Sequence, residues 1–306
     1  MKLLALVPPL VATLAVVEGK LISSQDINIS CGTSLDPTSS TTSLLKIASE
    51  AEDMMKLGLA ALQQSYSTLP VEEQIFQQLL MGTGSSLSDN RKAAADILQA
   101  TLSAAQGRAR SSSGRTLLIQ CGEGADTGIT TASEQGADGK PLPIRFLYNH
   151  VNKRKVDALE VTAPLYPTAC KPGVRAYVDG SVMVLCSSTW WQTIATRKSS
   201  RPISAIETLA AIEKNGKLKK GDKIGRIQDL SSFSFLHELM HWGTWDLVNG
   251  YTVGDSNGYE WDDIIAGFSK SPANSAQFYS FLCYGTRLIK DGFSWSKDGK
   301  ITGVPS

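Results

Sequence analysis

The amino-acid sequence predicts an α+β fold, in which helices lie before and after a small β-sheet. In the N-terminal and C-terminal thirds, apolar residues recur at intervals of three and four, as on the buried face of a helix. Between them, Arg175–Leu185 has two apolar runs around Asp179-Gly180, a dipeptide that accepts the positive φ angles of a tight hairpin turn. No repeat and no linker divides the chain into two complete cores.

The first residues of the chain have the layout of a secretory signal peptide. Met1-Lys2 is followed by an apolar run from Leu3 to Val17, and the small residue Gly19 lies near the expected cleavage point. We therefore expect residues 1–19 to be removed and the mature protein to be secreted, with no membrane partner.

Residues 20–110 are predicted to form a helical N-terminal region. Ser43–Leu62, Val71–Met81 and Asp89–Ala105 each carry an apolar stripe of helical period. The sequence leaves open whether part of this region is removed as a propeptide.

The second part of the chain, residues 111–306, is predicted to hold the sheet and further helices. Up to residue 172 we expect one short strand, Thr116–Cys121, and long surface loops, because Gly, Asp and Pro are frequent there. Ser204–Lys214 is predicted to be helical, and Ser271-Pro272 signals the start of a last long helix.

Five cysteines in an exported chain predict disulfide bonds. Cys170 and Cys186 flank the predicted hairpin and are the expected pair. Cys31, Cys121 and Cys283 remain, so one thiol should be free or bridged to another molecule.

The segment His237-Glu238-Leu239-Met240-His241 is the motif most directly linked to chemistry. Residues four apart share one face of a helix, so both imidazoles would point to one place where Zn²⁺ could bind. Glu238 could then act as the general base for a water molecule there. The chain has three histidines, and the third, His150, is expected in an exposed loop. The motif predicts zinc-assisted hydrolysis.

A catalytic zinc site needs a third protein ligand, with the fourth position left for water. The candidates are downstream carboxylates: Asp246, Asp255, Glu260, Asp262 and Asp263. Asp246 follows His241 too closely for an easy return to the metal, Glu260 has nearly the spacing of thermolysin-like enzymes, and Asp255 lies in a flexible Gly-containing loop. Asp262 and Asp263 could instead accept the free ring N–H of a ligating histidine. Spacing alone leaves the choice open.

Four segments of the chain are similar to motifs of one family of zinc peptidases. Phe235–His241 is similar to the family's His-Glu helix, and Gly254-Asp255 is similar to a shortened form of its Gly-Thr-x-Asp loop. Tyr259 is similar to the tyrosine that follows that loop, and Asn274–Phe281 is similar to a later helix with the pattern Asn-Ala-Asp-x-Tyr-x-Tyr-Phe. With these features the chain resembles the deuterolysin-like fungal metallopeptidases, the aspzincins, which include the peptidyl-Lys metalloendopeptidases. The resemblance covers some 45 residues, from His237 to about Phe281.

The resemblance implies His237, His241 and Asp255 as zinc ligands and Glu238 as general base. It implies that Tyr259 donates a hydrogen bond to the oxyanion of the tetrahedral intermediate.

For the whole chain, the resemblance implies a zincin-like single catalytic domain over residues 111–306 and the function of a secreted zinc metalloendopeptidase. We expect protein or peptide substrates, and the hairpin edge at Tyr177–Leu185 could pair with an extended substrate above the His-Glu helix. Because 30 Lys and Arg balance 29 Asp and Glu, no basic surface indicates a nucleic-acid partner. We expect a monomer, while the cleavage specificity, including any lysine preference, stays open.

The sequence departs from the family pattern beside Asp255. The family's Thr is missing before Asp255, Glu260 stands where the family has Gly after its Tyr, and an intact Gly-Thr-x-Asp occurs at 243–246 instead. These departures support an alternative function, that of a zincin-fold protein with impaired catalysis that binds zinc or a host or cell-surface protein. Glu238 favours the enzyme, because a site that only holds zinc needs no base there.

Overall fold

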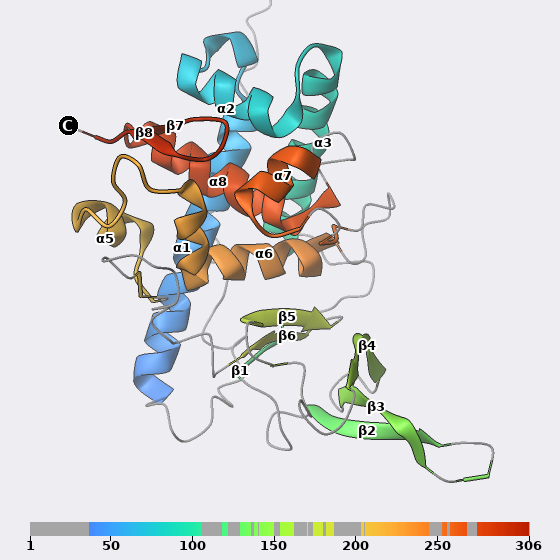
Figure 1. The fold of residues 1–306 in the computed structure, drawn as a ribbon. Coiled ribbons are helices and arrows are strands. Elements are labelled where there is room, and N and C mark those ends of the chain that lie inside the picture. The colour runs from blue at the N-terminus through green and yellow to red at the C-terminus, as the bar shows by residue number, and fades with distance from the viewer. Residues whose placement is uncertain are drawn as a thin grey trace, which may run out of the picture.

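The computed structural model describes a large part of the chain, and the fold is shown in Figure 1. The described residues are 37–105, 118–121, 129–135, 138–139, 141–149, 154–161, 170, 174–179, 182–186, 203–204, 206–244, 253–255, 258–267 and 274–305. The expected leader, Cys31, His150, Asp246 and the Ser271-Pro272 signal lie outside these residues.

Three helices form the N-terminal region, as predicted. They are α1 (Pro37–Gln63), α2 (Val71–Met81) and α3 (Ser85–Ala105), with a short 3-10 helix, η1 (Tyr66–Thr68), after α1. Helices α1 and α3 begin earlier than the apolar period predicts, and the added turn of α3 contributes Leu87 to the buried core.

The predicted hairpin is confirmed and belongs to a three-stranded sheet. Strands β5 (Ala176–Asp179) and β6 (Val182–Leu185) pair antiparallel, with Val178 opposite Met183. Strand β1 (Leu118–Cys121), part of the predicted Thr116–Cys121 strand, pairs parallel with β6, so the strand order is β1-β6-β5. The predicted disulfide between Cys170 and Cys186 is present at the end of β6. Cys283 is a free, buried thiol.

The prediction of long loops between residues 122 and 172 is wrong. Strands β2 (Ile129–Gln135), β3 (Pro141–Asn149) and β4 (Arg154–Val161) form an antiparallel sheet of order β2-β3-β4. The Gly and Pro residues near these strands hid a signal that is present, since Ile144, Phe146 and Tyr148 alternate along β3. In Figure 1 this sheet lies to one side, away from the helices.

The C-terminal part contains the predicted His-Glu helix and elements that the sequence did not predict. Its elements are α5 (Leu209–Lys214), η3 (Ile224–Asp229), α6 (Ser231–Thr244), α7 (Trp261–Gly267), α8 (Ala276–Lys290), β7 (Ser294–Trp295) and β8 (Ile301–Gly303).

Two predicted helix starts are wrong, because side chains closer to each helix cap it. Thr208 caps α5 by accepting a hydrogen bond from the Ala211 N–H, so the helix is shorter than predicted. Ser275 caps α8 by accepting from the Phe278 N–H, four residues after the predicted start.

Helix α6 lies at the centre of the molecule, between the other helices and the β1-β6-β5 sheet (Figure 1). One side packs against α1, α3 and α8, and the other faces β5. Gly243 allows the close crossing with α3, because a Cβ atom there would lie 2.5 Å from the Thr101 methyl group. Gly243 therefore serves helix packing rather than ending α6, which continues to Thr244.

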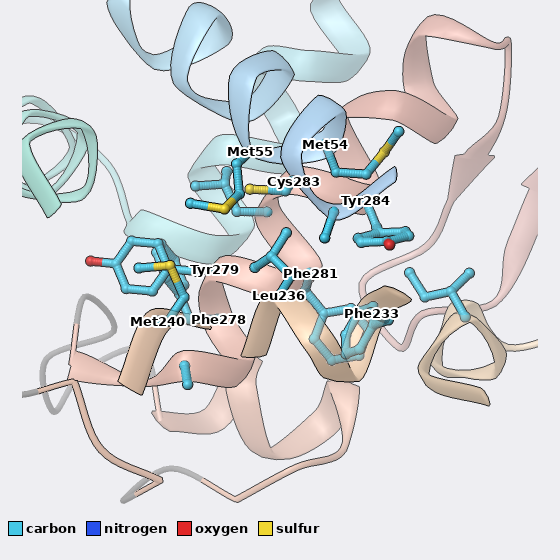
Figure 2. Packing of buried hydrophobic residues seen from close by; sticks show 14 of the residues in the cluster. Met54, Met55, Phe233, Leu236, Met240, Phe278, Tyr279, Phe281, Cys283 and Tyr284 are labelled. Carbon is cyan, nitrogen blue, oxygen red and sulfur yellow. The ribbon is translucent and has the colours of Figure 1, made fainter. Parts of the chain in front are cut away.

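The buried core joins the N-terminal helices to the His-Glu helix without interruption. Figure 2 shows Met54 and Met55 of α1 in the same cluster as Leu236 and Met240 of α6. The Phe233 ring meets Phe281 and Tyr284 of α8, with ring centroids 5.2 and 5.3 Å away. The α+β class is therefore observed, and α1 is part of the core that supports α6.

None of the described helices is both long and apolar enough to cross a membrane.

We predict that Met55→Ala lowers the free energy of unfolding by about 2–5 kcal/mol, because Met55 is fully buried against α8 and α6. Val71→Ala is the control, since Val71 is 64% exposed and should change stability by at most about 0.5 kcal/mol. Urea unfolding of the purified protein measures both. If the helical region were a removable propeptide, the mature protein would lack Met55, and N-terminal sequencing would begin after α1.

Candidate metal centre

Two imidazoles and one carboxylate converge on one point beside α6. The Nε2 atoms of His237 and His241, one helical turn apart, are 3.1 Å from each other. The Asp255 Oδ1 atom lies 3.1 Å from the first and 3.2 Å from the second. Within the described part of the chain, this is the one group of His, Cys, Asp or Glu side chains with the spacing of a metal site.

Asp255 reaches the two histidines because the start of α8 fixes the backbone before it. Gly254 forms a parallel β-bridge with Ser275. The Gly254 N–H donates to the Asn274 carbonyl at 2.7 Å, and the Gly254 carbonyl accepts from the Ala276 N–H at 3.0 Å. Asp255, 14 residues after His241 in the sequence, is thus held against α6 by a strand-like piece of backbone rather than by a loose loop.

The end of α6 holds the same segment from the other side. The Thr244 hydroxyl donates to the Met240 carbonyl at 2.7 Å and accepts from the Val253 N–H at 3.2 Å. The Val253 carbonyl accepts from Nδ1–H of His241 at 2.9 Å. Since a carbonyl can only accept, His241 carries a proton on Nδ1 and directs Nε2 toward Asp255.

His237 has its own partner on α8. Its Nδ1 atom lies 2.9 Å from Oε1 of Gln277, a side chain that is only 4% exposed. The expectation that Asp262 or Asp263 accepts a ring N–H of a ligating histidine is therefore wrong, because Gln277 and the Val253 carbonyl occupy those positions. Sequence reasoning missed Gln277, and the one signal for it was its place in the segment that resembles the later family helix.

The protonation of His241 and that of Asp255 depend strongly on each other. Burial alone would lower the pKa of His241, but its hydrogen bond to Asp255 and the charges of Glu238 and Asp255 raise this pKa to about 9. Burial alone would raise the pKa of the Asp255 carboxyl, but hydrogen bonds to His237 and His241 hold it well below its usual range. Without a cation, the proton on His241 balances the carboxylate.

Glu238 is a buried carboxyl that interacts electrostatically with this group. It is 7% exposed, follows His237 on α6, and feels the charges of both histidines. Burial raises the pKa of Glu238, and the nearby Asp255 charge adds to that effect. A carboxyl whose pKa is raised in this way is suited to accept and release a proton.

Tyr259 lies over the group from the loop before α7. Its hydroxyl donates to Asp255 Oδ2 at 2.9 Å, and its ring centroid is 5.8 Å from that of His237. The side chain is 53% exposed, so it borders both the ligand carboxylate and solvent. Burial and the Asp255 charge raise its pKa, so the hydroxyl stays protonated and able to donate.

The other carboxylates considered do not join the group. Glu260 and Asp262 are exposed, and Asp263 instead accepts the Glu260 N–H at 3.1 Å before α7. Asp246 lies outside the described residues.

The three convergent side chains fit a zinc ion. In a tetrahedral site with zinc–ligand distances of ~2.0–2.1 Å, the ligand atoms lie about 3.3 Å apart. The three separations here are 3.1, 3.1 and 3.2 Å. Two imidazole nitrogens and one carboxylate oxygen are a donor set typical of catalytic zinc, which keeps one position for water.

Comparison with known proteins adds no relative. The chain matches no protein-family model, no curated protein and no solved structure.

Proposed function

We propose that this protein is a secreted zinc metalloendopeptidase with a zincin-like catalytic domain. The observation that carries the proposal is the convergence of His237, His241 and Asp255 beside the buried Glu238. Three ligands are too few to close a zinc site, and a base beside the remaining position is what hydrolysis requires. The proposed substrates are proteins or peptides, and the proposed working form is a monomer.

His237, His241 and Asp255 would hold the zinc ion. When bound, zinc would supply Lewis-acid chemistry, acidifying a water molecule and polarising the scissile carbonyl group.

Glu238 would move the proton. Its carboxylate takes a proton from the attacking water, and the protonated acid then donates that proton to the leaving amine. Burial raises the pKa of Glu238 and so favours its protonated form, which suits a group that must both accept and release a proton.

Tyr259 would stabilise the charge that develops on the substrate. Its hydroxyl is a hydrogen-bond donor beside the ligand group, and it can exchange Asp255 for the oxyanion of the tetrahedral intermediate. Its exposure allows contact with a substrate lying over α6.

Strand β5 offers a place for the substrate backbone. It is the outer strand of the order β1-β6-β5 and packs against α6. An extended peptide that adds to this strand would have its backbone fixed by ladder hydrogen bonds next to the His-Glu helix.

We predict that Glu238→Gln leaves zinc content unchanged but lowers the rate of casein cleavage by about 10²–10⁴-fold, because the amide cannot accept the water proton. Glu260→Gln is the control, since Glu260 is exposed and outside the ligand group. An unmutated protein that binds zinc but cleaves nothing would instead favour the alternative, a zincin-fold protein that binds zinc or a host or cell-surface protein.

We predict that Asp255→Ala lowers zinc affinity by more than about 100-fold, because removing a ligand must cost more than removing a residue behind a ligand. Competition with a chromophoric chelator measures the dissociation constant, again with Glu260→Gln as control. Equal zinc affinity in the Asp255→Ala and unmutated proteins would show that another carboxylate is the third ligand.

We predict that zinc affinity rises with pH below about 9, because zinc must displace the proton that His241 holds in the metal-free site. The pKa of this histidine is raised, so the competing proton is fully present at neutral pH and is lost as the pH rises through about 9. Between pH of about 7 and 8 the affinity should increase about tenfold, with close to one proton released per zinc bound. Calorimetry in two buffers of different ionisation enthalpy counts this proton, and a pH-independent affinity would contradict the prediction.

A further inference from the structure

Gln277 makes two hydrogen bonds that lead in opposite directions from one buried amide. Its Oε1 lies 2.9 Å from Nδ1 of His237, and its Nε2 donates to the Tyr259 carbonyl at 2.6 Å. The residue is in the first turn of α8 and is 4% exposed. It therefore connects α8, the His-Glu helix and the loop that carries Tyr259.

The two contacts fix the orientation of the amide and, through it, the tautomer of His237. The Tyr259 carbonyl can only accept, so the amide nitrogen of Gln277 must face it. The amide oxygen then faces His237 and can only accept, so Nδ1 of His237 carries the hydrogen. In the metal-free site Nε2 of His237 hydrogen-bonds Asp255, and a bound zinc ion would replace that hydrogen. Because Nδ1 keeps its own hydrogen, the neutral imidazole then has its lone pair on Nε2, where the metal needs it.

We propose that Gln277 is a positioning residue that holds His237 in the Nδ1–H tautomer and ties this ligand to the backbone of Tyr259. The first part concerns metal binding alone, and the second rests on the proposed peptidase function. The amide of Gln277 thus makes the orientation of His237, a proposed zinc ligand, and the position of Tyr259, the proposed oxyanion donor, depend on each other.

The charge of the surroundings favours an amide at this position. Asp255 and Glu238 already place two carboxyl groups beside the histidines. A third carboxylate could accept from His237, but it would face the Tyr259 carbonyl with no hydrogen to donate. Glutamine supplies the acceptor and the donor without adding negative charge.

Two substitutions separate the two contacts. Gln277→Leu removes both, and Gln277→Glu keeps an acceptor for His237 but, when ionised, loses the donor to Tyr259. Gln77→Leu is the matched control, because Gln77 is an equally buried glutamine whose amide bonds to Glu73 and Arg91 instead.

We expect Gln277→Leu to lower zinc affinity by about 10–100-fold, as for loss of a partner behind a metal-bound histidine. Gln277→Glu should bind zinc at least as tightly as the unmutated protein but cleave casein about 10–100-fold more slowly at saturating substrate, because the Tyr259 loop is displaced. Gln77→Leu should lower stability while leaving zinc affinity unchanged, which distinguishes positioning from a structural role.

Nitrogen-15 NMR of the three histidines in the zinc-free protein reads the tautomer without any need for activity. The proposal expects Nδ1–H for His237 in the unmutated protein and in Gln277→Glu, and loss of this preference in Gln277→Leu. Unchanged zinc affinity in Gln277→Leu, or an Nε2–H tautomer in the unmutated protein, would overturn the proposal. Unchanged cleavage by Gln277→Glu would overturn the link to Tyr259.

A protein that cleaves nothing would refute the proposed function, yet zinc affinity and the tautomer would still test the role of Gln277. If Gln277→Leu fails to fold, the proposed role of Gln277 is tested by the Gln277→Glu variant and by the NMR spectrum of the unmutated protein.

Discussion

The packing of α8 against α6 is the constraint on which the candidate metal centre depends. Helix α6 alone can align His237 and His241, since its period places them on one face. The third ligand and the partner of His237 depend on the start of α8. The bridge between Gly254 and Ser275 delivers Asp255, and the amide of Gln277 lies behind His237. The buried aromatic contacts between the two helices, Phe233 with Phe281 among them, therefore set the geometry of the ligands as well as contributing to stability.

Electrostatics explain how the same group can exist with and without a cation. Two carboxyl groups, Asp255 and Glu238, lie beside two imidazoles in a partly buried place. In the metal-free state a proton on His241 offsets part of this negative charge, which is why its pKa is raised to about 9. A divalent cation between the same atoms would take over that compensation and release the proton. If zinc binds as proposed, the group would exchange this proton for the metal ion.

The sequence predicted those parts of the structure that depend on local periodicity and spacing. The three N-terminal helices, the hairpin at Arg175–Leu185 and the Cys170–Cys186 pair all follow from patterns within a few tens of residues. The antiparallel sheet β2-β3-β4 was missed because its strands carry mixed polar and apolar residues whose pairing is decided by neighbouring strands. At the metal group, spacing left five carboxylates in competition, and the resemblance pointed to Asp255. Backbone hydrogen bonds to residues 274 and 276 explain why this one reaches the histidines, and such contacts leave no mark in a one-dimensional pattern.

The burial of Glu238 is the physical argument that favours catalysis over mere zinc binding. A carboxyl group that is 7% exposed and close to another carboxylate carries a desolvation cost and a repulsion, both visible in its raised pKa. Zinc retention needs only the ligands and the groups behind them. Gln277 and the Val253 carbonyl, which contact the two histidines, would fill that second role. For a protein that only holds the ion, an uncharged residue at position 238 would avoid the cost. The carboxyl group has a use where a proton must leave a water molecule and reach an amine, and this is the chemistry that peptide-bond hydrolysis requires.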